Sequence, residues 1–400
     1  MGARMDNLSW MLGRDRHLFS SDFEKHGSEI GDAVRKSRFL VVGGAGSIGR
    51  ALTKLLFQLE PKALHVVDIS ENGLVELVRD IRSSKGYFSG DFRTFALDYG
   101  DREFGALLGY HGPYEYVANL AALKHVRSEK DPFTLMRMLM VNIVYPVSSL
   151  ELLDNGRTRK YFAVSTDKAA NPTSIMGVSK RIMESYLAAS EVRFPISTAR
   201  FANVAFSNGS LLDGFRYRVQ KRQPLSAPSD IRRYFISEDE AGRLCLLSLL
   251  LGHHKDIFFP WAPDELKLTS FAELAERFLL SRELTPVRCE TEEEARAFLG
   301  SKREGDEWPL YLFESDTTGE KPFEEFYVSS ESVDWNRYQE IGVVKNEVAV
   351  DPGSLDSFLS RIMQMRKQGS WTKKEILSAI SEVLPGFTHV DKGKSLDQRM

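Results

Sequence analysis

One stretch constrains the fold of this chain more than any other, the run FLVVGGAGSIGRALTKLL at residues 39–56. In it an apolar run meets glycines at every third position and then an amphipathic segment. Glycine lets the chain turn sharply and lets its backbone approach a pyrophosphate, which then lies at the positive N-terminus of the following helix. We therefore predict a nucleotide-binding strand, turn and helix, with a plain tight turn and helix cap as the alternative. The loop residues assigned to this site are Gly43, Gly46, Ser47, Ile48 and Gly49.

Short apolar runs recur after this stretch, and most are separated by segments with helical spacing. They read RFLVVGG, ALHVVD, RTFALDY, YEYVANLA, KYFAVST, ISTARFAN and DIFFPW. Strands that alternate with helices favour a parallel sheet covered on both faces. We predict an α/β fold with a doubly wound parallel sheet of the Rossmann type and a smaller, interleaved substrate lobe.

Breaks in this alternation predict the domain boundaries. The predicted segments are a helical extension at 1–36, a nucleotide-binding domain at 37–203 to which 234–262 returns, a substrate lobe at 204–233 and 263–345, and a helical tail at 346–400. The extension and the tail carry amphipathic patterns without site motifs. Because many enzymes bury such faces between symmetric subunits, we predict a homo-oligomer.

Composition limits the kind of partner. Of 400 residues, 42% are apolar and 27% charged, and the formal net charge is -3 with both signs mixed along the chain. This balance offers no electrostatic basis for binding nucleic acid or a membrane surface, and it favours small-molecule chemistry. Cys245 and Cys289 lie far apart without metal-ligand spacing, so we expect no metal site and a reducing cytoplasm. We also expect no signal peptide and no membrane span.

Asp68 predicts the cofactor. It ends the second predicted strand about 20 residues after the last loop glycine, where a carboxylate can hold a ribose diol. Because a carboxylate there would repel a 2′-phosphate, we expect NAD rather than NADP. Further cofactor positions follow the third and fourth strands, with a loop cap and ordinary packing as alternatives: Asp98, Tyr99, Leu120, Ala121 and Ala122.

With its motifs in this order, the chain resembles the extended short-chain dehydrogenase/reductase superfamily, and within it the CapD-like UDP-N-acetylglucosamine 4,6-dehydratases. The motifs span about residues 37–330 and are the glycine loop, NLAALKHV, Asn142, STDKAANPTSIMGVSK, RFANVAFSNGS, RRYFIS and GEKPFEEF. Some members carry transmembrane segments ahead of the catalytic region, which this chain is expected to lack. It departs from the pattern at Asn119, where His is common, and in a longer, more acidic stretch before GEKPFEEF.

The resemblance implies a bound NAD and a UDP-sugar substrate. The positions that would line the sugar cleft are Lys124, His125, Asn203, Ser207, Asn208, Arg233 and Glu320, and those that would join the cofactor site are Asn142, Ser165 and Lys180. A guanidinium at Arg233 would match a diphosphate bidentately, with a surface ion pair as the alternative. His125 could equally be structural, and GEKPFEEF a charged helix start.

The catalytic segment follows the apolar run YFAV. Thr166, Asp167 and Lys168 come at the carboxyl end of that predicted strand, where parallel sheets place ligands. Met176 occupies the usual position of a tyrosine and cannot take a proton. Lys180, four residues later on the same helix face, would reach the nicotinamide ribose.

A 4,6-dehydration needs a proton acceptor at the C4 hydroxyl, a base at C5 and an acid at C6. We predict that Asp167 accepts the C4 proton, directly or through Thr166, and later protonates the departing C6 hydroxyl. Lys168 is the predicted C5 base. The expected reaction converts a UDP-N-acetylhexosamine, UDP-N-acetylglucosamine by the family's habit, to the 4-keto-6-deoxy sugar in bacterial polysaccharide or glycan biosynthesis.

Two other functions remain open. A UDP-sugar epimerase would share the fold, the cofactor and the substrate class, but it needs no base at C5. The chain could also be a non-catalytic regulator that binds NAD or a nucleotide sugar. In that case Met176 would be the substitution that removed the catalytic base.

Overall fold

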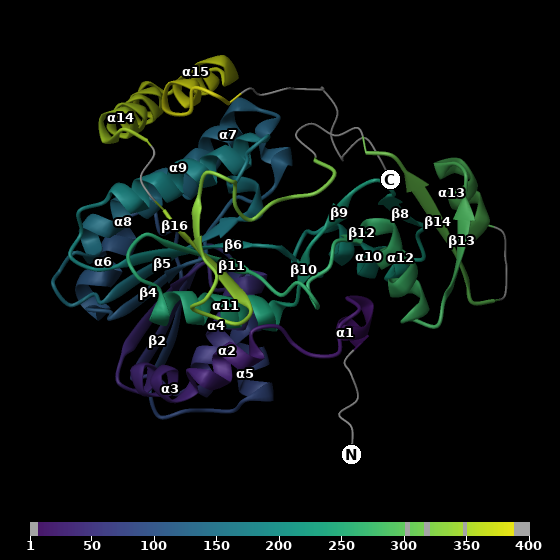
Figure 1. Cartoon of the computed structure of the whole chain (residues 1–400), viewed down its shortest axis with the longest axis horizontal. Helices are drawn as coiled ribbons and strands as arrows, with labels where there is room; N and C mark the ends of the chain where they lie inside the picture. Colours follow the sequence, from purple (N-terminus) through teal and green to yellow (C-terminus); the bar gives the residue numbers. More distant parts are fainter. Residues whose placement is uncertain (1–6, 301–304, 316–320, 347–349, 388–400) are drawn as a thin grey trace.

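The computed structural model describes residues 7–300, 305–315, 321–346 and 350–387, and a nine-stranded sheet lies at its centre (Figure 1). The strand order is β15-β16-β11-β6-β5-β4-β1-β2-β3. The strands that pair in parallel are β1 Arg38–Val42, β2 Ala63–Asp68, β3 Asp91–Ala96, β4 Tyr116–Asn119, β5 Lys160–Thr166, β6 Ile196–Phe201 and β11 Asp256–Pro260. The predicted doubly wound fold is therefore confirmed.

Two layers of helices cover the sheet, one on each face. Alternate residues of β1 show the reason, since Phe39 and Val41 point into one core while Leu40 and Val42 point into the other. The first core takes apolar side chains from α3 Gly27–Arg35, α4 Ser47–Gln58, α5 Glu71–Ser84 and α11 Glu238–Leu251. The second takes them from α6 Arg102–His111, α7 Pro132–Leu139, α8 Tyr145–Leu153, α9 Ile175–Ala189, α14 Pro352–Gln368 and α15 Lys373–Val383.

A smaller lobe lies beside the carboxyl edge of the sheet, as Figure 1 shows, and has its own apolar core. It is built on a three-stranded sheet, with helices packed against it. Its elements are β8 Leu225–Pro228, β13 Thr285–Cys289, β14 Glu307–Phe313, α10 Leu211–Gln220, α12 Phe271–Leu280 and α13 Glu292–Gly300. Two short pairs join the lobes: β7 Asn203–Val204 with β10 Phe235–Ile236, and β9 Arg232–Arg233 with β12 Thr269–Ser270.

The predicted boundary of this lobe at residue 345 extends too far. β15 Ser332–Asp334 and β16 Ile341–Lys345 belong to the central sheet, where β16 pairs antiparallel with the edge strand β11. The pairing buries Ile341, Val343 and Val344 and covers an edge that would otherwise be open. A five-residue run among charged segments did not reveal this long-range pairing.

The extension and the tail bury their apolar faces within the chain itself. Met11 and Leu12, at and just beyond the end of α1 Asn7–Met11, pack into the core of the smaller lobe. Phe19, just before α2 Ser20–Lys25, and Ile30 of α3 pack into the main core. Figure 1 shows α14 and α15 beside α7 and α9. A homo-oligomer stays a prediction, but these faces do not support it.

By length and composition, one helix of the described part could cross a membrane. It runs from Pro132 to Leu153 through α7, a π-turn at Met140–Val144 and α8, with a mean hydropathy of 1.3. Both the hydropathy and the burial refer to its most apolar 18-residue window, of which 72% is buried in the fold.

Candidate active site

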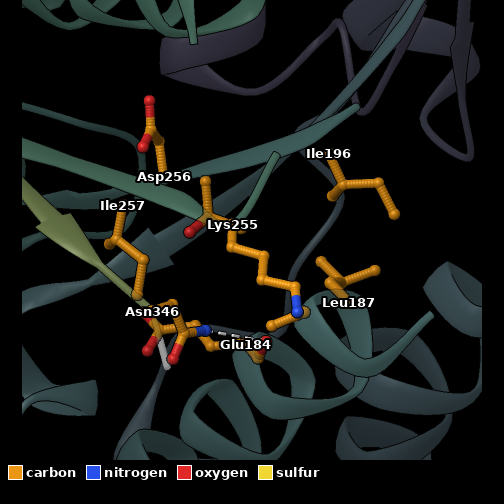
Figure 2. Close-up of a pocket in the computed structure, with 9 residues that line it drawn as sticks. Glu184, Leu187, Ile196, Lys255, Asp256, Ile257 and Asn346 are labelled. Carbon is orange, nitrogen blue, oxygen red and sulfur yellow. Dashed lines mark hydrogen bonds between the residues drawn. The ribbon is translucent and has the colours of Figure 1, made fainter. Parts of the chain in front are cut away.

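A cleft of about 580 Å³ opens at the carboxyl ends of the parallel strands, a volume typical of ligand sites. It is lined by the glycine loop, by the ends of β2, β3 and β4, and by Asn208. A second cavity, drawn in Figure 2, holds only about 10 Å³ at the opposite ends of β6 and β11. Ile196 and Asp256 begin those strands, and Asn346 donates to the Glu184 carbonyl there over 3.1 Å. That cavity has room for about one water, so it is a packing gap.

Gly43 is the residue that lets the nucleotide loop form. Its φ is +78°, and a Cβ on it would lie 2.5 Å from the Ala121 backbone nitrogen. The loop therefore packs directly on the segment after β4, and Leu120, Ala121 and Ala122 line the cleft beside it. This close approach fits a dinucleotide whose pyrophosphate meets backbone amides at the start of α4.

Asp68 bonds to two of the segments that line the cleft, the glycine loop and the turn after β2. One carboxylate oxygen accepts from the Ala45 amide and the other from the Ser70 amide, both over 2.9 Å. Arg50 lines the same cleft and donates to the Ala45 carbonyl over 2.9 Å. Arg50 was not among the cofactor residues predicted from the sequence.

The third-strand residues lie at the other end of the cleft. Asp98 accepts from Arg137, and the Tyr99 hydroxyl donates to the Val141 carbonyl. Burial raises the pKa of Tyr99 well above its usual value. All four residues line the cleft.

Two residues predicted to bind the cofactor are turned inward instead. Asn142 is fully buried and exchanges two hydrogen bonds of 3.0 Å with the Leu123 backbone, so it braces the loop that lines the cleft. The Ser165 hydroxyl donates to Glu184 over 2.6 Å. Asn142 therefore contacts the cleft lining through the Leu123 backbone, whereas Ser165 is bonded to a buried carboxylate.

Asp167 follows β5 directly, and its two carboxylate oxygens have different surroundings. Its Oδ1 accepts from the Thr166 hydroxyl over 2.9 Å and from the Lys168 amide over 2.8 Å, and the Lys168 ammonium lies 3.2 Å away. The residue is only 2% exposed, and its Oδ2 has no hydrogen-bond partner among the described residues. A buried, unpaired carboxylate oxygen is costly and is typical of a site that awaits a partner.

Helix α9 brings Met176 and Lys180 against this segment. Ser174 caps the helix by accepting from the Gly177 amide, and a Cβ on Gly177 would lie 2.6 Å from the Lys168 carbonyl oxygen, so glycine permits the contact. Met176 is buried in the second core, a placement that is compatible with either a packing role or a place in the catalytic segment.

Lys180 is buried beside the strand that carries Ser165. It donates to the Val164 carbonyl over 3.0 Å, and burial lowers its pKa to about 7. A lysine in this setting can exchange its proton near neutral pH.

The predicted sugar residues meet where the smaller lobe joins the sheet. Lys124 donates to the Ser207 hydroxyl over 3.3 Å, and the Asn208 amide donates to Ser47 of the glycine loop over 3.0 Å. Burial lowers the pKa of both Lys124 and His125. The loop after β7 thus connects the nucleotide loop to the segment after β4.

Asn203 offers an unused donor near the same edge. Its amide nitrogen is buried and has no hydrogen-bond partner in the described ranges. It follows β6, whose Phe201 pairs with Thr166, so both strands end at one edge of the sheet.

Arg233 does not lie open to a diphosphate as expected. It is 2% exposed and donates to the backbone carbonyls of Lys321 and Pro322 over 2.9 and 3.2 Å. Its guanidinium also faces Glu324 at 3.8 Å. Glu320, the predicted partner in the same motif, lies outside the described residues.

Glu324 was not among the site residues predicted from the sequence. It is 2% exposed, with one oxygen 3.8 Å from the Lys168 ammonium and the other 3.1 Å from that of Lys321. Burial raises its pKa. GEKPFEEF contains three glutamates, and nothing in the sequence alone marks this one. Within the described ranges, no group of three His, Cys, Asp or Glu side chains could hold a metal ion.

Comparison with protein families gives one match, to the family described as "Polysaccharide biosynthesis protein", over residues 39–346. A protein from Methanocaldococcus jannaschii, named only as an uncharacterized membrane protein, is 30% identical over 59% of this chain and 70% of its own length. A UDP-N-acetylglucosamine 4,6-dehydratase (inverting) from Campylobacter jejuni is 27% identical over 59% and 70%. A UDP-glucose 4-epimerase from Rickettsia prowazekii is also 27% identical, over 56% and 66%.

Two further relatives, polysaccharide biosynthesis proteins of Bacillus subtilis and Staphylococcus aureus, are matched over only 41% of their length. Among solved structures, Pen from Bacillus thuringiensis shares the fold with a TM-score of 0.62 at 18% identity, over 79% of this chain and 89% of that one. WbmF from Bordetella bronchiseptica, in complex with NAD⁺ and UDP, does so with a TM-score of 0.51 at 21% identity, over 70% and 82%.

Proposed function

Because the chain belongs to the polysaccharide biosynthesis protein family, in the CapD-like branch of the extended short-chain dehydrogenase/reductases, we propose that it is an NAD-dependent nucleotide-sugar 4,6-dehydratase. The proposed substrate is a UDP-N-acetylhexosamine, with UDP-N-acetylglucosamine as the first to test. The observation that carries this proposal is the pair Asp167 and Lys168 at the end of β5. The unpaired Oδ2 of Asp167 is available to a substrate hydroxyl there.

The glycine loop and Asp68 would hold NAD, which would supply the hydride acceptor for C4 and the hydride donor for C6. Asp167 accepts the proton of the C4 hydroxyl through Oδ2. Lys168, as the free amine, then removes the C5 proton beside the new ketone, and Asp167 passes its proton to the C6 hydroxyl, which leaves as water. Lys168 finally returns its proton to C5, so both side chains regain their starting states.

Met176 leaves the proton transfer at C4 to Asp167, because a thioether cannot serve as a base. A tyrosine needs a strongly lowered pKa before it becomes a base, whereas a carboxylate is ionised near neutral pH. Thr166 supports this division, since its hydroxyl donates to Oδ1 and leaves Oδ2 for the substrate.

The test is incubation of the purified chain with UDP-N-acetylglucosamine in heavy water, followed by mass spectrometry and NMR. We expect loss of water and deuterium at C5 together. A product that is an epimer of the substrate, with no loss of water and no deuterium at C5, would favour the epimerase. The relative from Rickettsia prowazekii is named as such an enzyme. Cofactor binding without turnover on any UDP-hexose would favour a regulator.

Asp68 should make the chain prefer NAD, although Arg50 lies in the same cleft. We expect Asp68→Asn to weaken NAD binding by roughly 1.5 to 3 kcal/mol, the value of a hydrogen bond to a charged group. The difference in affinity between NAD and NADP should become smaller. Asparagine can keep one of the two loop contacts. Calorimetric titration of both cofactors checks this, and a wild type that prefers NADP would contradict it. A cytoplasmic location also belongs to the proposal, whereas a homo-oligomeric state stays a prediction that the buried faces of the extension and the tail do not support.

A further inference from the structure

A single segment, residues 321–331, lies across the catalytic edge, and two buried arginines hold it there. Arg233 donates to the carbonyls of Lys321 and Pro322, and Arg200 donates to the carbonyl of Phe326 over 2.9 Å. We call residues 321–331 the strap. Arg200 is completely buried and also pairs with Glu331 at 2.7 Å, so both ends of the strap are fixed.

Between these two anchors, the strap brings one carboxylate to the catalytic pair. Glu324 is 2% exposed, although the residues on either side of it, Phe323 and Glu325, are exposed. Its Oε1 lies 3.8 Å from the Lys168 ammonium, which also lies 3.2 Å from Asp167. Lys168 therefore lies close to two buried carboxylates that come from distant parts of the chain.

We propose that Glu324 is a positioning residue of the catalytic edge, which holds Lys168 beside Asp167 and controls when Lys168 can accept a proton. The proposal rests on the proposed function, in which Lys168 is the C5 base. An anion next to an ammonium favours its charged form, so Glu324 keeps Lys168 protonated up to a higher pH. It also keeps the amine within reach of the substrate bound by Asp167.

The charged groups around Glu324 are consistent with this role. Burial and the nearby Asp167 raise its pKa, while the cations of Lys168, Lys321 and Arg233 lower it, and burial dominates. Lys321 and Arg233 approach from the strap and from β9, so the carboxylate stays anchored when Lys168 changes its charge.

Glu324→Gln tests the proposal, since it keeps the shape of the side chain and removes its charge. The quantity to follow is the pH midpoint of Lys168, the pH at which half of its amines have lost a proton. We expect this midpoint to fall by about one unit, the size of a typical shift from one close charge. The midpoint is measured by competitive labelling of the amine with acetic anhydride and peptide mass spectrometry, which needs no turnover. The rising limb of the pH profile of kcat/KM should move to lower pH by the same amount.

Two further variants make the result specific. Glu325→Gln removes the same charge one residue away, on an exposed side chain, and should leave the midpoint unchanged. Glu324→Asp keeps the charge on a shorter stem, and its midpoint should lie between those of wild type and Glu324→Gln. If Glu324→Gln does not fold, this smaller downward shift still tests the proposal.

The possible outcomes separate this inference from the proposed function. An unchanged Lys168 midpoint in the Gln or Asp variant overturns the role of Glu324, even if the wild type dehydrates its substrate. A wild type that loses no water, but whose Lys168 midpoint falls in Glu324→Gln, rejects the proposed function and retains the control of Lys168 by Glu324.

Discussion

Asp167→Asn should lower turnover by about 10² to 10⁴ and suppress the first oxidation. Asparagine can keep the contacts that Oδ1 makes with Thr166 and Lys168, so the local fold should survive. Its amide nitrogen would replace Oδ2, the unpaired atom that is proposed to accept the C4 proton. Stopped-flow absorbance of NADH after mixing with the UDP-sugar measures the first step directly.

Asp351→Asn is a matched control, because Asp351 caps α14 through the Ser354 amide over 2.9 Å and belongs to no part of the site. It should leave turnover unchanged, since asparagine caps a helix nearly as well. Met176→Tyr is a second control: wild type should already be active, and the phenol should add little in a packed core. An inactive wild type rescued by Met176→Tyr would refute the proposed mechanism.

Lys168→Arg should stop the reaction at a different step from Asp167→Asn. Arginine keeps a positive charge close to Asp167 and Glu324, but its guanidinium does not act as a base at neutral pH. We expect NADH to appear transiently, because the C4 oxidation is intact, while deuterium exchange at C5 and loss of water fall by about 10² or more. The two readouts are stopped-flow absorbance and NMR in heavy water.

Arginine is preferred to alanine here because alanine would remove the cation that the two buried carboxylates share. Lys367→Arg on the exposed end of α14 makes the same exchange away from the site and should have no effect. Full C5 exchange in Lys168→Arg would show that another group is the base. Loss of the NADH transient would show that Lys168 is needed for the first step as well.

Local patterns made most of the fold predictable. The glycine loop was identified because Gly43 needs a positive φ and Gly49 needs room at the loop carbonyl of Gly43, both of which only glycine provides at these positions. The strands were identified because alternate side chains such as Phe39 and Leu40 must enter opposite cores. For the same reason the sequence alone places Asp167 and Lys168 at the carboxyl end of a strand.

Pairings between distant segments were not predictable in this way. β16 joins the central sheet only because β11 presents an edge to it, and the extension and tail pack inside one chain rather than between subunits. Amphipathic spacing predicts that one face of a helix will be buried, but it does not predict which segment will pack against that face.

The same division applies to the site. The sequence by itself determined the nucleotide loop, the carboxylate of Asp68 and the run from Thr166 to Lys168, because each depends on neighbours in the chain. Only the tertiary structure decided that Arg233 binds backbone carbonyls, that Met176 is core, and that Glu324 faces Lys168. A guanidinium or a carboxylate has the same chemistry wherever it occurs, and its role depends on which charges and carbonyls the folded chain brings within a few ångströms of it.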